Sequence, residues 1–194
     1  NTCVDEAHEL VTRHGVVAVV VNRVASASSI ASRLRENAGD QVDVVLLTGR
    51  MRPLDRDDAL HALRDRIMVG RDRSRVDRRL IVVATQCIEA GADFDCDALV
   101  TEAASLDALR QRFGRVDRLG HYKRAEGVIV HDRSAKDDPV YGQAIVRTAA
   151  WMKRRLAENK RKEIDFGVLA LSLPAEEELK YLTAPKAHAP VLLP

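Results

Sequence analysis

Short runs of apolar, mostly β-branched residues recur along the chain, separated by stretches in which polar and apolar positions alternate with helical spacing. Nearly all-apolar runs of this length are typical of parallel strands that are buried on both faces. The runs occupy residues 16–21, 42–47, 80–84, 98–101 and 127–130. They predict a sheet of parallel strands.

The helical pattern fills the gaps between these runs and predicts helices over residues 26–37, 53–69, 106–118 and 139–160. Residues 70–79 are expected to form a polar loop, and prolines make the chain irregular after Lys162. Because strands and helices alternate, the sequence predicts an α/β fold, an open parallel sheet with helices on both faces.

The length suits one domain with an appendage, because domains of roughly 100–200 residues are the usual unit and this chain has 194. We expect a domain over residues 1–135 and a C-terminal extension, helical and then irregular, over residues 136–194. The sequence opens with neither an initiator methionine nor a signal-peptide pattern, which indicates a fragment of a larger protein.

Composition and cysteine usage exclude several protein classes. With 46% hydrophobic and 31% charged residues, the chain has the balance of an ordinary soluble globular protein. Its longest aliphatic run, residues 16–21, is far shorter than the roughly 20 residues of a membrane span, so no membrane contact is expected. The cysteines Cys3, Cys87 and Cys96 are scattered without histidines at ligand spacing, so we expect neither disulfides nor a metal site, in a reducing cytoplasm.

Charge is strongly segregated although the net charge is only +2. Residues 80–107 carry six acidic side chains and no Lys or Arg, whereas residues 110–124 carry six basic side chains against one Asp. The acidic part of the first segment follows the strand expected at residues 80–84, at the sheet edge where α/β proteins bind ligands. In the second, Arg115 and Arg118 are three apart and are expected on one helix face, with Gly114 inside the helix at a cost of about 1 kcal/mol.

These two segments carry a resemblance to a known family. The first reads T-x-x-x-E-x-G-x-D, at Thr85, Glu89, Gly91 and Asp93. The second reads Q-R-x-G-R-x-x-R, at Gln111, Arg112, Gly114, Arg115 and Arg118. Together and in this order they resemble motifs V and VI in the second RecA-like lobe of superfamily 2 helicases. Residues 84–120 are similar to the helicase-nuclease of type I CRISPR systems.

The resemblance implies roles for these residues in an ATP-driven motor. It implies that Arg115 and Arg118 act as arginine fingers with Gln111 near the γ-phosphate, and that Gly91, Asp93 and Arg112 approach the nucleotide. ATP and Mg²⁺ would be held mainly by the first RecA-like lobe, because no G-x-x-x-x-G-K-[ST] phosphate loop occurs in this sequence. The partners implied are that first lobe, single-stranded DNA and a CRISPR effector complex.

A second set of residues resembles the positions that grip a nucleic-acid backbone. Asn22 and Ser26 resemble motif IV, Thr48, Gly49 and Arg50 resemble the next nucleic-acid motif, and Thr85 begins motif V. Hydroxyls, amide hydrogens and a cation suit phosphate contacts that do not read bases. Capping and turn roles remain the alternative for Ser26 and Gly49.

Two alternative functions stay open beside a DNA motor in CRISPR antiviral defence. One is a lobe of another superfamily 2 helicase acting on RNA or DNA, and the other is a non-catalytic α/β module that binds nucleic acid or scaffolds a complex.

The string Asp5-Glu6-Ala7-His8 spells a DEAH box, but no apolar strand precedes it. Because Val4, Ala7 and Val11 share a helical face, it is expected to be an ordinary helix.

Overall fold

The computed structural model describes the whole chain apart from residues 1, 75–76, 90–92, 133–137, 159–161 and 186–194. Within the described residues, five strands form one sheet in the order β2-β3-β1-β4-β5, and each of these pairings is parallel. The strands are β1 (Val16–Val20), β2 (Val42–Leu47), β3 (Arg79–Ala84), β4 (Ala98–Glu102) and β5 (Glu126–Val130). The parallel sheet predicted from the apolar runs is confirmed.

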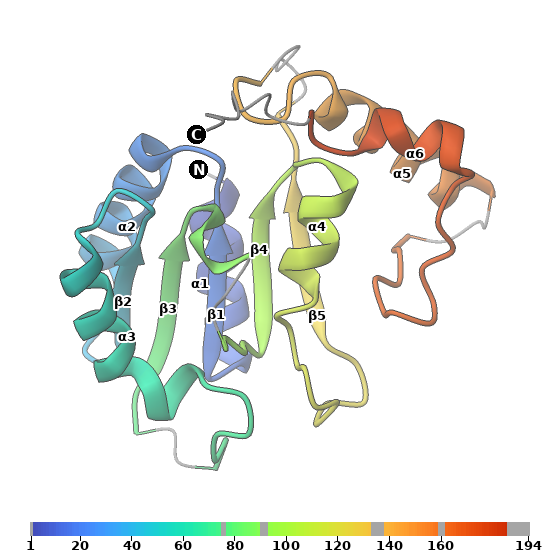
Figure 1. Ribbon diagram of the computed structural model, residues 1–194. Coiled ribbons are helices and arrows are strands. Elements are labelled where there is room, and N and C mark those ends of the chain that lie inside the picture. The colour runs from blue at the N-terminus through green and yellow to red at the C-terminus, as the bar shows by residue number, and fades with distance from the viewer. Residues whose placement is uncertain (1, 75–76, 90–92, 133–137, 159–161, 186–194) are drawn as a thin grey trace, which may run out of the picture.

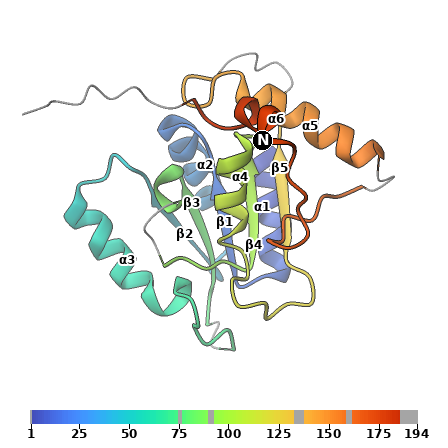
Figure 2. The same ribbon diagram turned by 45° about the vertical axis from the view of Figure 1, so that its right-hand side comes forward.

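Helices cover both faces of this sheet, as predicted (Figures 1 and 2). Helices α1 and α2 pack on one face, and α3 packs on the other together with the end of α4. The helices are α1 (Thr2–Arg13), α2 (Val24–Asn37), α3 (Pro53–Ile67), α4 (Leu106–Phe113), α5 (Ala144–Glu158) and α6 (Glu176–Leu182), with a 3₁₀ turn at Gln86–Ile88. None of the described helices combines the length and apolar character needed to cross a lipid bilayer.

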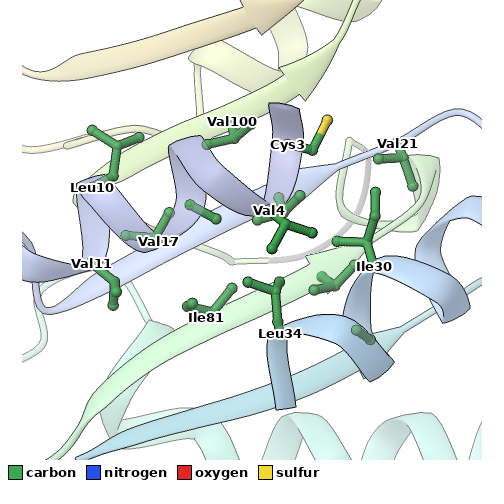
Figure 3. Close-up of a cluster of buried hydrophobic side chains, with 14 of the residues drawn as sticks. Cys3, Val4, Leu10, Val11, Val17, Val21, Ile30, Leu34, Ile81 and Val100 are labelled. Carbon is green, nitrogen blue, oxygen red and sulfur yellow. The ribbon is translucent and has the colours of Figure 1, made fainter. Parts of the chain in front are cut away.

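The central strand β1 is buried on both faces, which explains its unbroken apolar sequence. Val17 points toward α1, where it meets Val4, Leu10 and their neighbours (Figure 3), and Val19 belongs to the same cluster. The alternate residues of β1 pack against α3 on the opposite face. The Asp5–His8 string lies on α1, so its prediction as an ordinary helix is confirmed.

The C-terminal extension shares a core with the sheet domain. Tyr141 and Ile145 pack against Ala104 and Leu109, and Trp151 packs with Leu182 against α4. In Figure 1, α5 and α6 accordingly lie together beside α4.

Helix α6 falls where the sequence predicted an irregular chain, so that expectation was wrong. The proposed domain boundary at residue 135 lies outside the described residues, and the division stays a prediction.

Helix α4 is shorter than predicted. It ends at Phe113, and Gly114 forms its C-terminal cap with φ −65° and ψ −2°. The chain then turns to pair with Cys96, just before β4, since the Cys96 amide donates to Arg115 O and the Asp117 amide donates to Cys96 O. The expectation that Gly114, Arg115 and Arg118 share one helix was therefore wrong.

Candidate functional site

The carboxyl ends of β2 and β3 bring together two of the predicted nucleic-acid segments. Leu47 and Ala84 are register partners, so Thr48 and Thr85 follow them at the same edge of the sheet. The Gly49 amide lies 3.4 Å from Thr85 Oγ1, and Arg50 is exposed beside it. The structure thus places these four residues on one rim of the sheet, whereas their binding role stays a prediction.

The motif IV residues occupy the end of the adjacent strand β1, with different exposure. Ser26 is partly exposed in the first turn of α2. Asn22 is buried, its Nδ2 donates to Ala103 O at 2.9 Å, and its Oδ1 accepts from Arg112 Nη2 at 3.0 Å. Because this amide is engaged inside the protein, the structure does not support a direct contact between Asn22 and nucleic acid.

Arg112 occupies the interior of the site with none of its side chain exposed. A guanidinium group has five N–H donors, and all five meet protein acceptors here. Nε donates to Glu89 Oε1 at 2.8 Å. Nη1 donates to Thr101 Oγ1 at 2.8 Å and to Glu102 O at 3.1 Å. Nη2 donates to Asn22 Oδ1 and, at 2.8 Å, to the Tyr141 hydroxyl.

This arrangement changes the role expected for Arg112. A buried cation is tolerated only when its donors are paired, and here the pairing leaves no donor for a nucleotide. We therefore correct its assignment from nucleotide ligand to a structural junction, which we call the Arg112 node. The node comprises Arg112 with the five residues that accept its hydrogen bonds, Asn22, Glu89, Thr101, Glu102 and Tyr141.

The sequence analysis did not suggest Thr101, Glu102 or Tyr141 as members of the node, and Tyr141 lies outside the motif region altogether. Burial raises the pKa of Tyr141 to about 12, so its hydroxyl stays protonated. It can therefore accept from Arg112 and donate to Glu89 Oε1, which lies 3.3 Å away. A single tyrosine outside the motifs carries no sequence signal for such a role.

The two candidate arginine fingers lie beside the motif V segment. Arg115 is partly buried, and its Nη2 donates to the main-chain oxygen of Glu89 at 2.7 Å. Arg118 Nη1 donates to Asp93 Oδ1 at 3.0 Å, and about a third of the Arg118 side chain is exposed, 36%. Gln111 is exposed on α4. The predicted residue Gly91 lies outside the described residues.

The electrostatics of this pair suit an anion. Burial lowers the pKa of the Arg115 guanidinium, and the positive charge of Arg118 lowers it further. Two cations whose charges repel each other are stabilised when an anion shares them, and planar guanidinium groups bind phosphate oxygens in pairs. The donor set therefore fits the phosphates of a nucleotide.

A buried cluster of ion pairs fixes the turn that carries Arg118. Arg71 and Arg73, from the segment after α3, pair with Asp95 and Asp97. Arg73 Nη2 also lies 3.1 Å from Asp117. Asp95 Oδ1 accepts the main-chain amide of Arg118 at 3.0 Å. The sequence predicted only a polar loop at residues 70–79, because alternating Arg and Asp residues give no indication of burial.

Asp117 stabilises this turn through its backbone conformation and its carboxylate. Its φ of 45° is the only positive value among the described residues other than glycine, a conformation that aspartate tolerates better than most residues. Its carboxylate accepts the amides of His121 and Tyr122 at 2.9 and 2.8 Å. These bonds close the loop between α4 and β5 and help to hold Arg118 in place.

Comparisons with known proteins identify the family. The sequence model for the C-terminal region of the CRISPR-associated nuclease/helicase Cas3 matches residues 13–121, which is more than half of the chain. Cas3 of Methanothermobacter thermautotrophicus is 35% identical over 103 residues, covering 53% of this chain and 11% of that protein. Cas3 of Escherichia coli K12 is 33% identical over 108 residues, covering 56% and 12%. The chain thus spans about a tenth of these relatives.

The fold agrees with this assignment. The crystal structure of T. fusca Cas3 with ADP matches 79% of this chain and 20% of that one, with a TM-score of 0.67 and 25% identity. The sheet order and the helices on both faces are therefore those of a RecA-like lobe. The chain belongs to the family of the Cas3 C-terminal region and is a superfamily 2 helicase lobe of the Cas3 type.

Proposed function

We propose that this chain is the second motor lobe of an ATP-dependent helicase that translocates on single-stranded DNA in CRISPR antiviral defence. The observation that carries the proposal is the placement of Arg115 and Arg118 beside Glu89 and Asp93. These are the positions that the helicase motifs assign to the nucleotide cleft. The family assignment supports the same conclusion.

On the nucleotide side, the two arginines supply positive charge where phosphates would lie. Bound ATP with Mg²⁺, held mainly by the first RecA-like lobe, supplies the phosphoryl group that passes to water. Arg115 and Arg118 would stabilise the negative charge that develops in this transfer, an effect of about 10³- to 10⁵-fold in related enzymes. Gln111 would lie near the γ-phosphate and Asp93 near the ribose, and Gly91 remains a candidate in the same segment.

On the nucleic-acid side, the shared rim of β2 and β3 offers hydroxyl groups, a main-chain amide and one cation. Thr48, Gly49, Arg50 and Thr85 would follow the backbone of a single strand, with Ser26 at the adjacent strand end. Contacts of this kind position a strand without reading its sequence. The name of the family supports a CRISPR effector complex as a further partner.

The isolated chain is expected to show no ATP hydrolysis above background, because its sequence has no phosphate loop. The intact protein that contains it is expected to hydrolyse ATP and to be stimulated by single-stranded DNA. The test measures phosphate release by both proteins with no nucleic acid, with single-stranded DNA and with RNA of the same sequence. Turnover by the isolated chain, or an intact protein without turnover, would contradict the proposal. Stimulation by RNA alone would favour an RNA helicase.

Arg50→Ala is expected to weaken binding of the intact protein to single-stranded DNA equally for all base sequences. It removes one phosphate contact, so the log–log slope of affinity against salt should flatten by roughly 0.7. ATPase activity without DNA should persist, while its stimulation by DNA falls. Binding measured at several salt concentrations checks this, with the exposed Arg33→Ala on α2 as control. An unchanged slope would show that Arg50 is only a turn residue.

A further inference from the structure

The C-terminal extension contributes one side chain to the interior of the motor lobe. Tyr141 lies between β5 and α5, is only 4% exposed, and places its hydroxyl between Arg112 and Glu89. The Gln86 side chain also lies within hydrogen-bond reach of this hydroxyl, and the ring packs with apolar residues, among them Ala103, Leu109 and Ile145. Apolar contacts therefore hold the ring, while the hydroxyl reaches the Arg112 node.

The extension holds this tyrosine firmly. The carboxylate of Asp138 accepts the main-chain amide of Tyr141 at 3.0 Å and that of Val140 at 2.8 Å. Asp138 also lies 3.8 Å from Arg23, next to the start of α2. Gly142, the residue after Tyr141, donates its amide to Asp138 O. The turn before α5 is thus tied both to itself and to the lobe, which fixes the position of the hydroxyl.

Glu89 connects this hydroxyl to a candidate arginine finger. Its carboxylate takes hydrogen bonds from Arg112 and Tyr141, while its main-chain oxygen accepts from Arg115 Nη2. A carboxylate held by two donors restricts the torsions of its own residue. Whatever orients the Glu89 side chain therefore also restricts the carbonyl that holds Arg115.

We propose that Tyr141 is a positioning residue for Arg115, acting through Glu89, so that the extension completes the motor lobe. The inference rests on the proposed function, because it gives Arg115 a role in ATP hydrolysis. It adds that the packing of the extension against the lobe determines the position of the Arg115 side chain. Displacement of the turn before α5 withdraws one hydrogen-bond partner from Arg112 and one from Glu89 at the same time.

Tyr141→Phe tests this with the smallest possible change. Phenylalanine keeps the ring in its apolar contacts and removes only the hydroxyl, so Arg112 loses an acceptor and Glu89 loses a donor. In the intact protein we expect the kcat for DNA-stimulated ATP hydrolysis to fall about tenfold, with the KM for ATP within about twofold of the parent value. Such a split is expected when a group acts in the transition state rather than in binding.

Tyr181→Phe is the matched control. Tyr181 belongs to α6 of the same extension, is 60% exposed, and meets Arg147 through its ring, which phenylalanine retains. This variant should keep both kinetic constants. Thermal unfolding of both variants establishes a temperature at which each is fully folded, and kinetics and single-strand binding are measured there. A merely structural role of Tyr141 would then leave kcat unchanged.

The outcomes separate this inference from the proposed function. If the parent protein hydrolyses ATP and Tyr141→Phe lowers kcat at constant KM, the inference is supported. If the parent is active and the folded variant keeps its kcat, or changes only KM, the inference is overturned while the proposed function stands. A parent without DNA-stimulated hydrolysis would overturn both.

Discussion

Arg115→Ala is expected to lower the ATP hydrolysis rate of the intact protein by at least about 10²-fold, because a finger stabilises charge that develops only in the transition state. Arg118→Ala should have an effect of the same order. Binding of single-stranded DNA should remain nearly intact, since neither side chain belongs to the rim formed by β2 and β3. Steady-state ATPase kinetics and equilibrium binding measure the two quantities separately.

Arg110→Ala provides the control for these variants. Arg110 is also an arginine of the motif VI region, but it is exposed on α4. Its removal should change the hydrolysis rate by less than about twofold, because surface charges away from a site contribute little. Unchanged ATP turnover in both Arg115→Ala and Arg118→Ala would contradict the proposed motor function and favour a non-catalytic module.

Asp97→Ala is expected to destabilise the 194-residue chain by about 3–5 kcal/mol, because it removes a buried carboxylate that pairs with two arginines and leaves them only Asp95 and Asp117. Asp97 is 4% exposed and accepts from both Arg71 and Arg73. It also accepts the Val16 amide at 2.7 Å, at the start of the central strand. Chemical denaturation of parent and variant gives the difference in the free energy of unfolding.

Asp43→Ala is a close control for this measurement. Asp43 also pairs with two arginines, Arg66 at 2.7 Å and Arg78 at 3.0 Å, but its side chain is 31% exposed. Solvent screens these pairs, so the loss should be about 1 kcal/mol or less. Equal losses for both variants would show that burial of the Arg71 and Arg73 cluster contributes nothing beyond a surface pair.

The strands and the rim of the sheet could be predicted from local pattern alone. An apolar run such as residues 16–20 reports burial on both faces, because each residue of a central parallel strand meets a covered surface. Parallel strands in register then end together, which places Thr48 beside Thr85. The motif spacing likewise brought Glu89, Asp93, Arg115 and Arg118 into one proposed site, and the structure places them in contact.

The end of α4 and the presence of α6 could not be predicted from local sequence pattern. Helix α4 ends early because the following residues pair with Cys96, a partner distant in sequence. Helix α6 has only seven residues and would be marginal alone. It is stabilised where Leu182 packs with Trp151 and Leu106.

The sequence by itself determined the fold class, the family resemblance and the rim that would carry a nucleic-acid strand. Only the tertiary structure decided which charged residues face inward. Arg112 and Arg118 look alike in the motif, yet one is wholly buried and the other is partly exposed. The difference arises because a guanidinium can be buried only where enough acceptors converge. Those acceptors come from residues as distant along the chain as Asn22 and Tyr141, which only folding brings together.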